Sequence, residues 1–248
     1  MKAMILAAGL GTRLLPLTDD RPKALVMVAG RTLLEITLAR LRSFGIHEVI
    51  INTHHFADLV ADYLRRHDNF GMQITISYEE ILLDTGGGLK RAAHFFLSSR
   101  ESKEPFLVHN VDVLSTIDFN RLLRFHSERS ALATLAVQNR PTSRYLLFDK
   151  NGQLCGRRSG LDGPTELVRP VKEFQASAFC GVHIMSPRIF GLMKEADVFS
   201  IIPVYLRLTA QSERIIGFPA DEYYWRDLGR PEHISEAIGD ISDGTYPG

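Results

Sequence analysis

The sequence has little cysteine and no excess of either charge. Only Cys155 and Cys180 occur among 248 residues, and their spacing matches neither a C-x-x-C pair nor a zinc site, which fits a reducing compartment such as the cytoplasm. Lysine and arginine number 29, as do aspartate and glutamate, so the zero net charge argues against a nucleic-acid partner. No run of about 18 apolar residues is present, which argues against a membrane partner.

The chain does contain a regular alternation of strand-like and helix-like segments before residue 140. Six segments carry it: apolar runs at 2–7, 48–52 and 105–110, and amphipathic stretches at 33–44, 55–66 and 118–129. This rhythm predicts βαβ units and an α/β, Rossmann-like fold, whose mixed, mainly parallel sheet has helices on both faces. Beyond residue 140, short strands around the turn at Asn151-Gly152 predict a small antiparallel lid.

A glycine-rich loop follows the first strand, with the sequence GLGTR at 9–13. It is not a P-loop, and Leu14 stands where a dinucleotide-binding fingerprint needs its third glycine. The N–H groups of such a loop bind anions, and Arg13 and Lys23 add positive charge nearby. The residues alone leave a second interpretation open, a plain turn with two solvated cations.

Three segments together resemble the sugar-1-phosphate nucleotidylyltransferases, the nucleoside-diphosphate-sugar pyrophosphorylases. They are LAAGLGTRLLPLT at 6–18, RPKAL at 21–25 and YWRDLGRPE at 224–232. The agreement spans many positions, and the chain length is that of the short members that transfer uridylyl or guanylyl groups. The resemblance implies a single domain over 1–248, with a nucleotide-binding core at 1–140 and a sugar-binding lid with closing elements at 141–248.

The resemblance also implies which residues carry out the reaction. A sugar 1-phosphate attacks the α-phosphorus of a nucleoside triphosphate (NTP) and releases pyrophosphate, which requires cations rather than a covalent residue. Arg13 is expected at the pyrophosphate and Lys23 between the two reacting phosphates. The expected nucleotide-binding residues are Ala8, Gly9, Gly11, Thr12, Gly86 and Gly87.

The expected metal site consists of Asp112 and Asp227, which the resemblance makes the ligands of Mg²⁺. The family commonly has glycine before the first of these carboxylates, and this chain has Val111 instead. A β-branched residue there is expected to narrow the acceptor pocket, unless its side chain points into the core.

The remaining substrate contacts are expected on both sides of the pocket. Asn110, Lys172 and Gly181 are the expected sugar-phosphate-binding residues. Glu79 or Glu80 offers acceptors for the N–H groups of guanine, and UTP or GTP is the favoured NTP. We expect a monomer or small homo-oligomer. Two alternatives remain: a cytidylyltransferase acting on phosphocholine or a similar phosphomonoester, and a non-catalytic sensor of nucleotide sugars.

Overall fold

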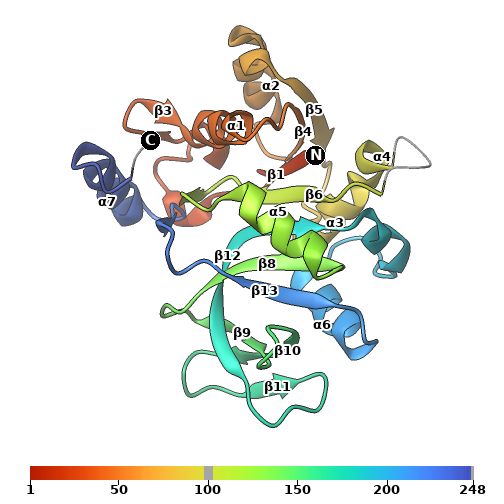
Figure 1. The fold of residues 1–248 in the computed structure, drawn as a ribbon. Helices are drawn as coiled ribbons and strands as arrows, with labels where there is room; N and C mark the ends of the chain where they lie inside the picture. The colour runs from red at the N-terminus through yellow and green to blue at the C-terminus, as the bar shows by residue number, and fades with distance from the viewer. Residues whose placement is uncertain (98–102, 247–248) are drawn as a thin grey trace.

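A single mixed sheet runs through the computed structural model, which describes residues 1–97 and 103–246 (Figure 1). Within these residues its ten strands are β1 (Ala3–Leu6), β4 (Glu48–Thr53), β5 (Gln73–Tyr78), β6 (Phe106–Asn110), β8 (Ala133–Gln138), β9 (Arg144–Phe148), β10 (Leu154–Ser159), β11 (Thr165–Leu167), β12 (Gln175–Met185) and β13 (Ile215–Pro219). Their order is β11-β10-β9-β12-β6-β1-β4-β5, and β8 joins β12 and carries β13.

Helices cover both faces of this sheet, which confirms the predicted fold class. One face packs against α1 (Leu33–Ser43), α2 (Ala57–Arg66) and α5 (Phe119–Glu128), with α7 (Pro231–Ser242) beside them; the other packs against α3 (Asp84–Arg91), α4 (Ala93–Phe96) and α6 (Ile201–Ala210). Successive strand residues point to opposite faces, so Ala3 and Ile5 join the first core and Met4 joins the second. Buried apolar surface on both faces therefore stabilises the central strands.

The predicted antiparallel strands continue the central sheet instead of forming a layer of their own. β1, β4, β5 and β6 pair in parallel, whereas β12 pairs antiparallel with β6, β8 and β9. Strands from before and after residue 140 therefore belong to one continuous hydrogen-bonded sheet. In Figure 1 the strands β9, β10 and β11 form the end of the sheet farthest from α2.

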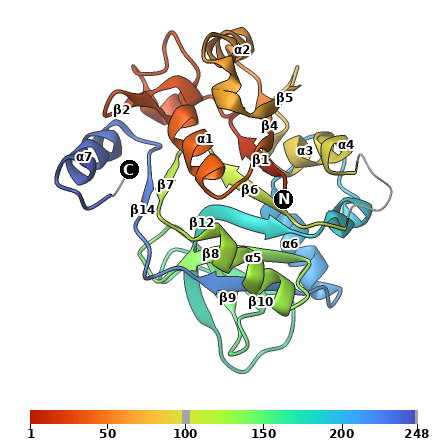
Figure 2. The same ribbon diagram turned by 45° about the horizontal axis from the view of Figure 1, so that its top comes forward.

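Two small sheets and four short helices complete the described structure. β2 (Met27–Val28) pairs with β3 (Arg31–Thr32), and β7 (Val113–Ser115) pairs antiparallel with β14 (Trp225–Asp227). The 3₁₀ helices are η1 (Thr12–Leu14), η2 (Lys23–Leu25), η3 (Asp68–Gly71) and η4 (Pro187–Leu192). Figure 2 shows β7 and β14 side by side between α7 and β12.

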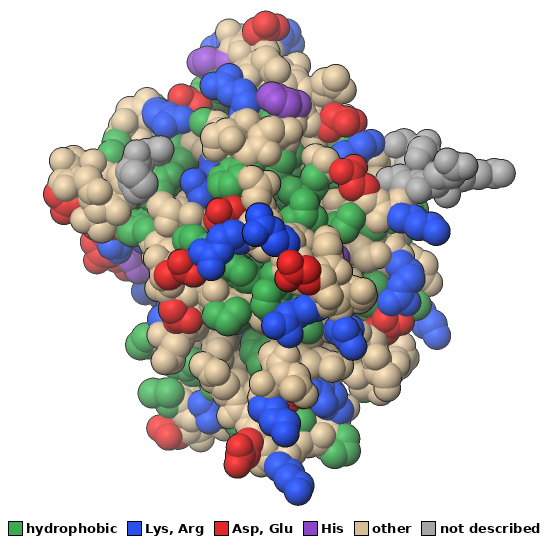
Figure 3. Space-filling model, in the orientation of Figure 1, with side chains coloured by type: hydrophobic (Ala, Val, Ile, Leu, Met, Phe, Trp, Pro, Cys, Tyr) green, Lys and Arg blue, Asp and Glu red, His purple; other side chains and the backbone are tan. Residues whose placement is uncertain are grey.

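The surface mixes both charge signs. Acidic and basic side chains are interspersed over the face shown in Figure 3. Among the helices of residues 1–97 and 103–246, none is long and apolar enough to cross a bilayer.

Candidate active site

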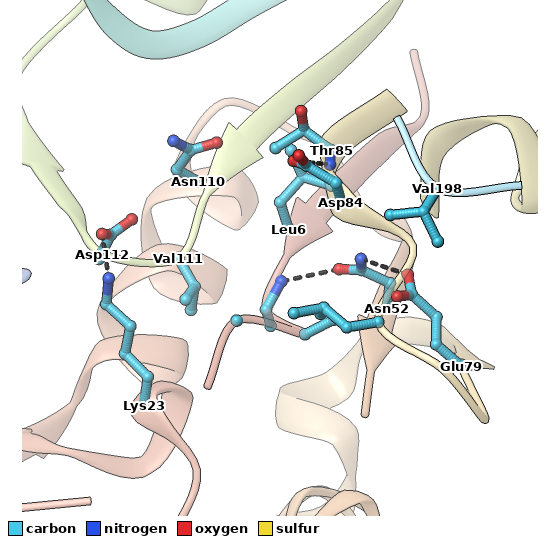
Figure 4. A pocket seen from close by; sticks show the side chains of 14 residues that line it. Leu6, Lys23, Asn52, Glu79, Asp84, Thr85, Asn110, Val111, Asp112 and Val198 are labelled. Atoms are coloured by element: carbon cyan, nitrogen blue, oxygen red, sulfur yellow. Dashed lines mark hydrogen bonds and ion pairs between the residues drawn. The ribbon is translucent and has the colours of Figure 1, made fainter. Parts of the chain in front are cut away.

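A pocket of about 350 Å³ lies at the carboxyl ends of β1, β4 and β6 (Figure 4). Its lining comprises Leu6, Ala7, Ala8, Gly9, Lys23, Asn52, Glu79, Leu82, Asp84, Thr85, Asn110, Val111, Asp112 and Val198. Loops after neighbouring parallel strands meet at this edge, which is where ligands bind in open α/β sheets. The topology therefore brings Ala8, Gly9, Lys23, Asn110 and Asp112 from the predicted set to one place.

The glycine loop folds back on itself before it reaches Lys23. Gly11 has a φ of +69°, and a Cβ there would lie 3.0 Å from Thr18 Cγ2 and 3.3 Å from Lys23 Cβ. Thr18 donates its hydroxyl to the Gly11 carbonyl at 3.0 Å, and Leu14 donates its N–H to the same oxygen at 2.8 Å. Glycine is required at this position because the backbone is left-handed and the returning part of the loop is in contact.

Lys23 forms an ion pair with Asp112 at the mouth of the pocket. Each side chain is only 13% exposed. Lys23 is the first residue of η2 and follows Pro22, and Asp112 lies two residues after the end of β6. A partly buried charge of each sign is thus held at the point where anionic substrates would enter.

The second predicted carboxylate, Asp227, lies on the strand next to Asp112. Asp227 is paired with Val113 in the β7–β14 ladder, and Leu228 donates its N–H to the Asp112 carbonyl at 2.7 Å. A two-carboxylate site is what Mg²⁺ needs when phosphates supply its other ligands. Among residues 1–97 and 103–246 no group of three or more His, Cys, Asp or Glu side chains is suited to a metal.

Arg13 meets Asp227 at Gly229. A Cβ on Gly229 would lie 2.7 Å from Asp227 Oδ1 and 2.8 Å from Arg13 Nη2, so both groups converge on the open side of this glycine. Asp227 Oδ1 also accepts the Gly229 N–H at 2.8 Å. Arg13 is otherwise exposed, as is its neighbour Thr12, and neither lines the pocket. The guanidinium therefore lies beside the carboxylates and remains accessible to a polyanion.

Asn110 and Gly181 face each other across the β6–β12 pair. Gly181 has a φ of +72° at an irregularity of β12, and a Cβ there would lie 2.8 Å from Asn110 Nδ2. The third predicted sugar-phosphate residue, Lys172, is exposed before β12 and is not part of the pocket lining. The structure thus brings the first two together and leaves Lys172 apart from them.

Arg140 and Trp225 connect β14 to β12 next to Asp227. The Arg140 guanidinium lies 3.5 Å from the centre of the Trp225 ring and donates to the Phe179 carbonyl at 2.9 Å. The Trp225 indole donates to the Cys180 carbonyl at 2.8 Å. Burial lowers the pKa of Arg140, and it raises the pKa of Cys180 to about 12, so that side chain is a neutral thiol. Sequence reasoning missed Arg140, which follows a buried strand without a motif.

Glu79 supports the pocket wall and has no oxygen free of a partner. Its carboxylate is fully buried and accepts hydrogen bonds from Asn52 Nδ2 at 2.7 Å and from the Leu83 N–H at 2.9 Å. Asn52 Oδ1 in turn accepts the Ala7 N–H at 2.7 Å. Glu80 is exposed and outside the lining. The expectation that one of these glutamates reads guanine therefore has no geometric support.

The glycines at 86–88 are buried against other parts of the chain. A Cβ on Gly86 would lie 2.4 Å from the Phe199 ring, one on Gly87 would lie 2.5 Å from the Asp197 carbonyl oxygen, and one on Gly88 would lie 2.6 Å from a Glu79 oxygen. Gly86 and Gly87 are not in the pocket lining, although both were expected to bind nucleotide. Packing against the segment before α6 explains the glycines at 86 and 87, and packing against Glu79 explains the glycine at 88.

The Val111 side chain is 3% exposed and belongs to the core on the α1 side of the sheet, although the residue also borders the pocket. This burial favours the alternative in which Val111 points into the core.

Three further lining residues have no signal in the sequence: Leu82, Asp84 and Val198. Asn52 has one usable signal, since it is a polar residue directly after the apolar run at 49–51 of β4.

Comparison with known proteins places residues 2–153 under the family model for nucleotidyl transferases. The chain is 34% identical over 239 residues to an N-acetylmuramate alpha-1-phosphate uridylyltransferase from Caulobacter vibrioides, covering 93% of this chain and 92% of the relative. It is 26% identical over 245 residues to a mannose-1-phosphate guanylyltransferase catalytic subunit beta from Dictyostelium discoideum, covering 96% of this chain and 64% of that relative. A UDP-glucose pyrophosphorylase solved with UDP-glucose has the same fold, with a TM-score of 0.78, 18% identity and 98% coverage of both chains.

Proposed function

This chain belongs to the nucleotidyl transferase family, and on that basis we propose that it transfers a nucleotidyl group from an NTP to a sugar 1-phosphate. The products are a nucleoside diphosphate sugar and pyrophosphate. One observation carries the proposal: two carboxylates and two cations from distant parts of the chain lie beside one pocket, Lys23 and Asp112 in its lining and Asp227 and Arg13 next to them.

The reaction needs neutralised charge more than it needs a nucleophilic side chain. An oxygen of the sugar phosphate forms a bond to the α-phosphorus, the bond from that phosphorus to the β-phosphate oxygen breaks, and pyrophosphate leaves with the electron pair. Lys23 is suited to the two reacting phosphates because it lies in the lining, and its pairing with Asp112 keeps it in place. Arg13 is suited to pyrophosphate, since its planar guanidinium binds two oxygens at once.

Asp112 and Asp227 are the residues that would hold Mg²⁺. The two carboxylates lie on adjacent strands and offer the hard oxygen donors that Mg²⁺ prefers. Mg²⁺ also needs further oxygen ligands, and two phosphorylated substrates entering the site would supply them. Bound there, Mg²⁺ would supply positive charge to the phosphates during transfer.

The other assignments divide between the two parts of the chain. We assign the N–H groups at Ala8, Gly9, Gly11 and Thr12 to the NTP phosphates, and Asn110, Gly181 and Lys172 to the sugar phosphate. Gly181 and Lys172 lie in the proposed sugar-binding part at 141–248, and Asn110 joins them from the nucleotide-binding core at 1–140. Gly86 and Gly87 lie outside the pocket lining, and their role is to hold the pocket wall in position through close packing.

The cellular setting is also a proposal. Both cysteines are free and buried in the described structure, which suits a reducing compartment, and we propose the cytoplasm. We further propose that the protein acts as a monomer or small homo-oligomer.

A substrate matrix tests the proposed function. Each common NTP is combined with a panel of sugar 1-phosphates in Mg²⁺, and pyrophosphate release is measured. At least one pair should turn over, EDTA should abolish the signal, and Asp112→Asn should lose it while exposed Asp162→Asn retains it. A non-catalytic sensor would bind nucleotide without releasing pyrophosphate, and a phosphocholine enzyme would respond only when CTP and phosphocholine are supplied.

A further inference from the structure

We propose that Asp84 selects the nucleobase, and that the base it selects is guanine. The inference rests on the proposed function, because it assigns the NTP that the pocket accepts. The family model names no base, and the relatives include uridylyltransferases at 34% identity and guanylyltransferases at 26–28% identity.

Asp84 lies at the end of the pocket away from the phosphate-binding charges. Lys23 and Asp112 mark one end of the lining, and Asp84 lies with Thr85 and Val198 at the other (Figure 4). Val198 is 53% exposed, so an apolar surface is available there for the flat face of a base. An NTP with its phosphates at Lys23 would extend its base toward Asp84.

The backbone of Asp84 is held in a conformation that ordinary residues avoid. Its φ is +60°, in the left-handed region where a Cβ is crowded. One carboxylate oxygen accepts the N–H of Thr85 at 2.5 Å, which fixes the side chain. Among the described residues no cation is paired with Asp84, and the side chain is exposed. The left-handed backbone of Asp84 costs conformational free energy, and such strain at a pocket wall indicates a functional role.

Helix capping does not supply that role. An N-cap carboxylate normally accepts the N–H groups of the first helical turn. In α3 those of Gly86 and Gly87 are donated instead to the Phe199 carbonyl, at 2.9 and 3.1 Å. The carboxylate of Asp84 is therefore left to face the pocket with most of its acceptor capacity unused.

The segment around Asp84 is fixed from both sides. Leu83 donates its N–H to Glu79 at 2.9 Å, and its carbonyl accepts the Phe199 N–H at 3.2 Å. The Thr85 hydroxyl accepts the Ile201 N–H at 3.0 Å, at the start of α6. A carboxylate held by such a frame has a defined position, as base discrimination requires.

Guanine is the base whose edge fits a carboxylate best. It presents two adjacent donors, the N1–H and the N2 amino group, and a carboxylate accepts from both at once. Uracil presents a single N–H between two carbonyl oxygens that the carboxylate repels. Adenine and cytosine each place a ring acceptor beside their one amino donor. Because both oxygens of the neighbouring Glu79 are engaged, Asp84 is the carboxylate available for this contact.

The decisive variant is Asp84→Gly. Glycine adopts a positive φ without strain, so this change should leave the melting temperature equal or higher while it removes the carboxylate. Asp84→Asn keeps the size and replaces one acceptor oxygen by a donor. The matched control is Asp68→Gly, an exposed position with a φ of +48° outside the pocket lining.

The experiment compares GTP, UTP and inosine triphosphate, which lacks the N2 amino group. For the unaltered protein we expect kcat/KM of pyrophosphate release to favour GTP over UTP on the order of 10–100-fold, with inosine triphosphate between them. Asp84→Gly and Asp84→Asn should lose this preference, and Asp68→Gly should retain it. A preference for UTP, or a GTP preference that survives in Asp84→Gly, would overturn the assignment.

A failure of the proposed function would give a different result. If no sugar phosphate yields pyrophosphate, calorimetric titration of GTP and UTP in Mg²⁺ still measures base choice. Tighter binding of GTP that disappears in Asp84→Gly would support the role of Asp84 without turnover, and equal binding of both nucleotides would refute it.

Discussion

Replacing Gly87 with alanine should destabilise the protein even though alanine is the better helix former. The new Cβ would lie 2.5 Å from the backbone oxygen of Asp197 and 3.0 Å from the Cβ of Leu83. Neither is the end of a flexible side chain, so the segment before α6 must shift. Overpacking of this kind costs about 1–3 kcal/mol, and alanine returns about 0.5–1 kcal/mol of helix propensity. We expect a net loss of roughly 1–2 kcal/mol.

Gly239→Ala is the matched control for this prediction. Gly239 lies inside α7 and is exposed, and no atom lies within 4 Å of the position that a Cβ would take there. The same substitution should therefore stabilise the protein by about 0.5–1 kcal/mol, because only the helix propensity changes. Opposite signs for two glycine-to-alanine changes in helices would isolate the effect of close packing.

Urea unfolding followed by circular dichroism measures both variants, together with the KM for the NTP. If close packing explains Gly87, the main effect of Gly87→Ala is a lower free energy of unfolding. The KM for the NTP then changes only because the pocket wall moves. A Gly87→Ala protein as stable as the parent, with a strongly raised KM, would refute this reasoning. It would favour direct contact between the glycine backbone and the nucleotide.

The other predictions concern charge, packing and protonation. Arg13→Ala should lower kcat/KM for the NTP on the order of 100-fold with every sugar phosphate. Arg13→Lys should also be impaired, because lysine cannot bind two phosphate oxygens at once as the guanidinium does. Full activity of the alanine variant would remove Arg13 from pyrophosphate binding. Val111→Gly should cost about 1–3 kcal/mol by leaving a cavity, with unchanged sugar selectivity, and a wider sugar range at an unchanged melting temperature would contradict this. Burial lowers the pKa of His126 to about 4 from about 6.5. Between these pH values the imidazole is therefore protonated in the unfolded chain and neutral in the folded chain. Stability should thus fall as the pH drops from about 6.5 to 4, and His126→Gln should reduce this dependence in pH-dependent melting curves, with exposed His47→Gln as the matched control; buried His109 and His183, whose pKa values are also lowered, account for the remainder.

The central strands could be predicted well because their apolar runs are local signals. The runs at 2–7, 48–52 and 105–110 became β1, β4 and β6, and the ends of these strands line the pocket. Thr32 caps α1 with its side chain, which accepts the Glu35 N–H at 3.0 Å. Each of these features is encoded within a few neighbouring residues, so periodicity and capping chemistry are sufficient to find it.

The site depended on information that no short window contains. β7 and β14 have three residues each, and their pairing brings Asp227 beside Asp112 from far along the chain. Composition and spacing say nothing about such a contact, and only the resemblance to known nucleotidylyltransferases predicted it. The same limit hid Asp84, whose importance comes from a left-handed backbone and from a carbonyl of Phe199 that takes over the helix cap.

The most direct test of the central claim is pyrophosphate release from the NTP and sugar 1-phosphate matrix, with the parent protein and Asp227→Asn measured side by side. We predict Mg²⁺-dependent release for at least one substrate pair and loss of several kcal/mol of transition-state stabilisation in the variant, with an unchanged circular dichroism spectrum. Release at near-parental rates by Asp227→Asn, or no release from any pair in Mg²⁺, would contradict it.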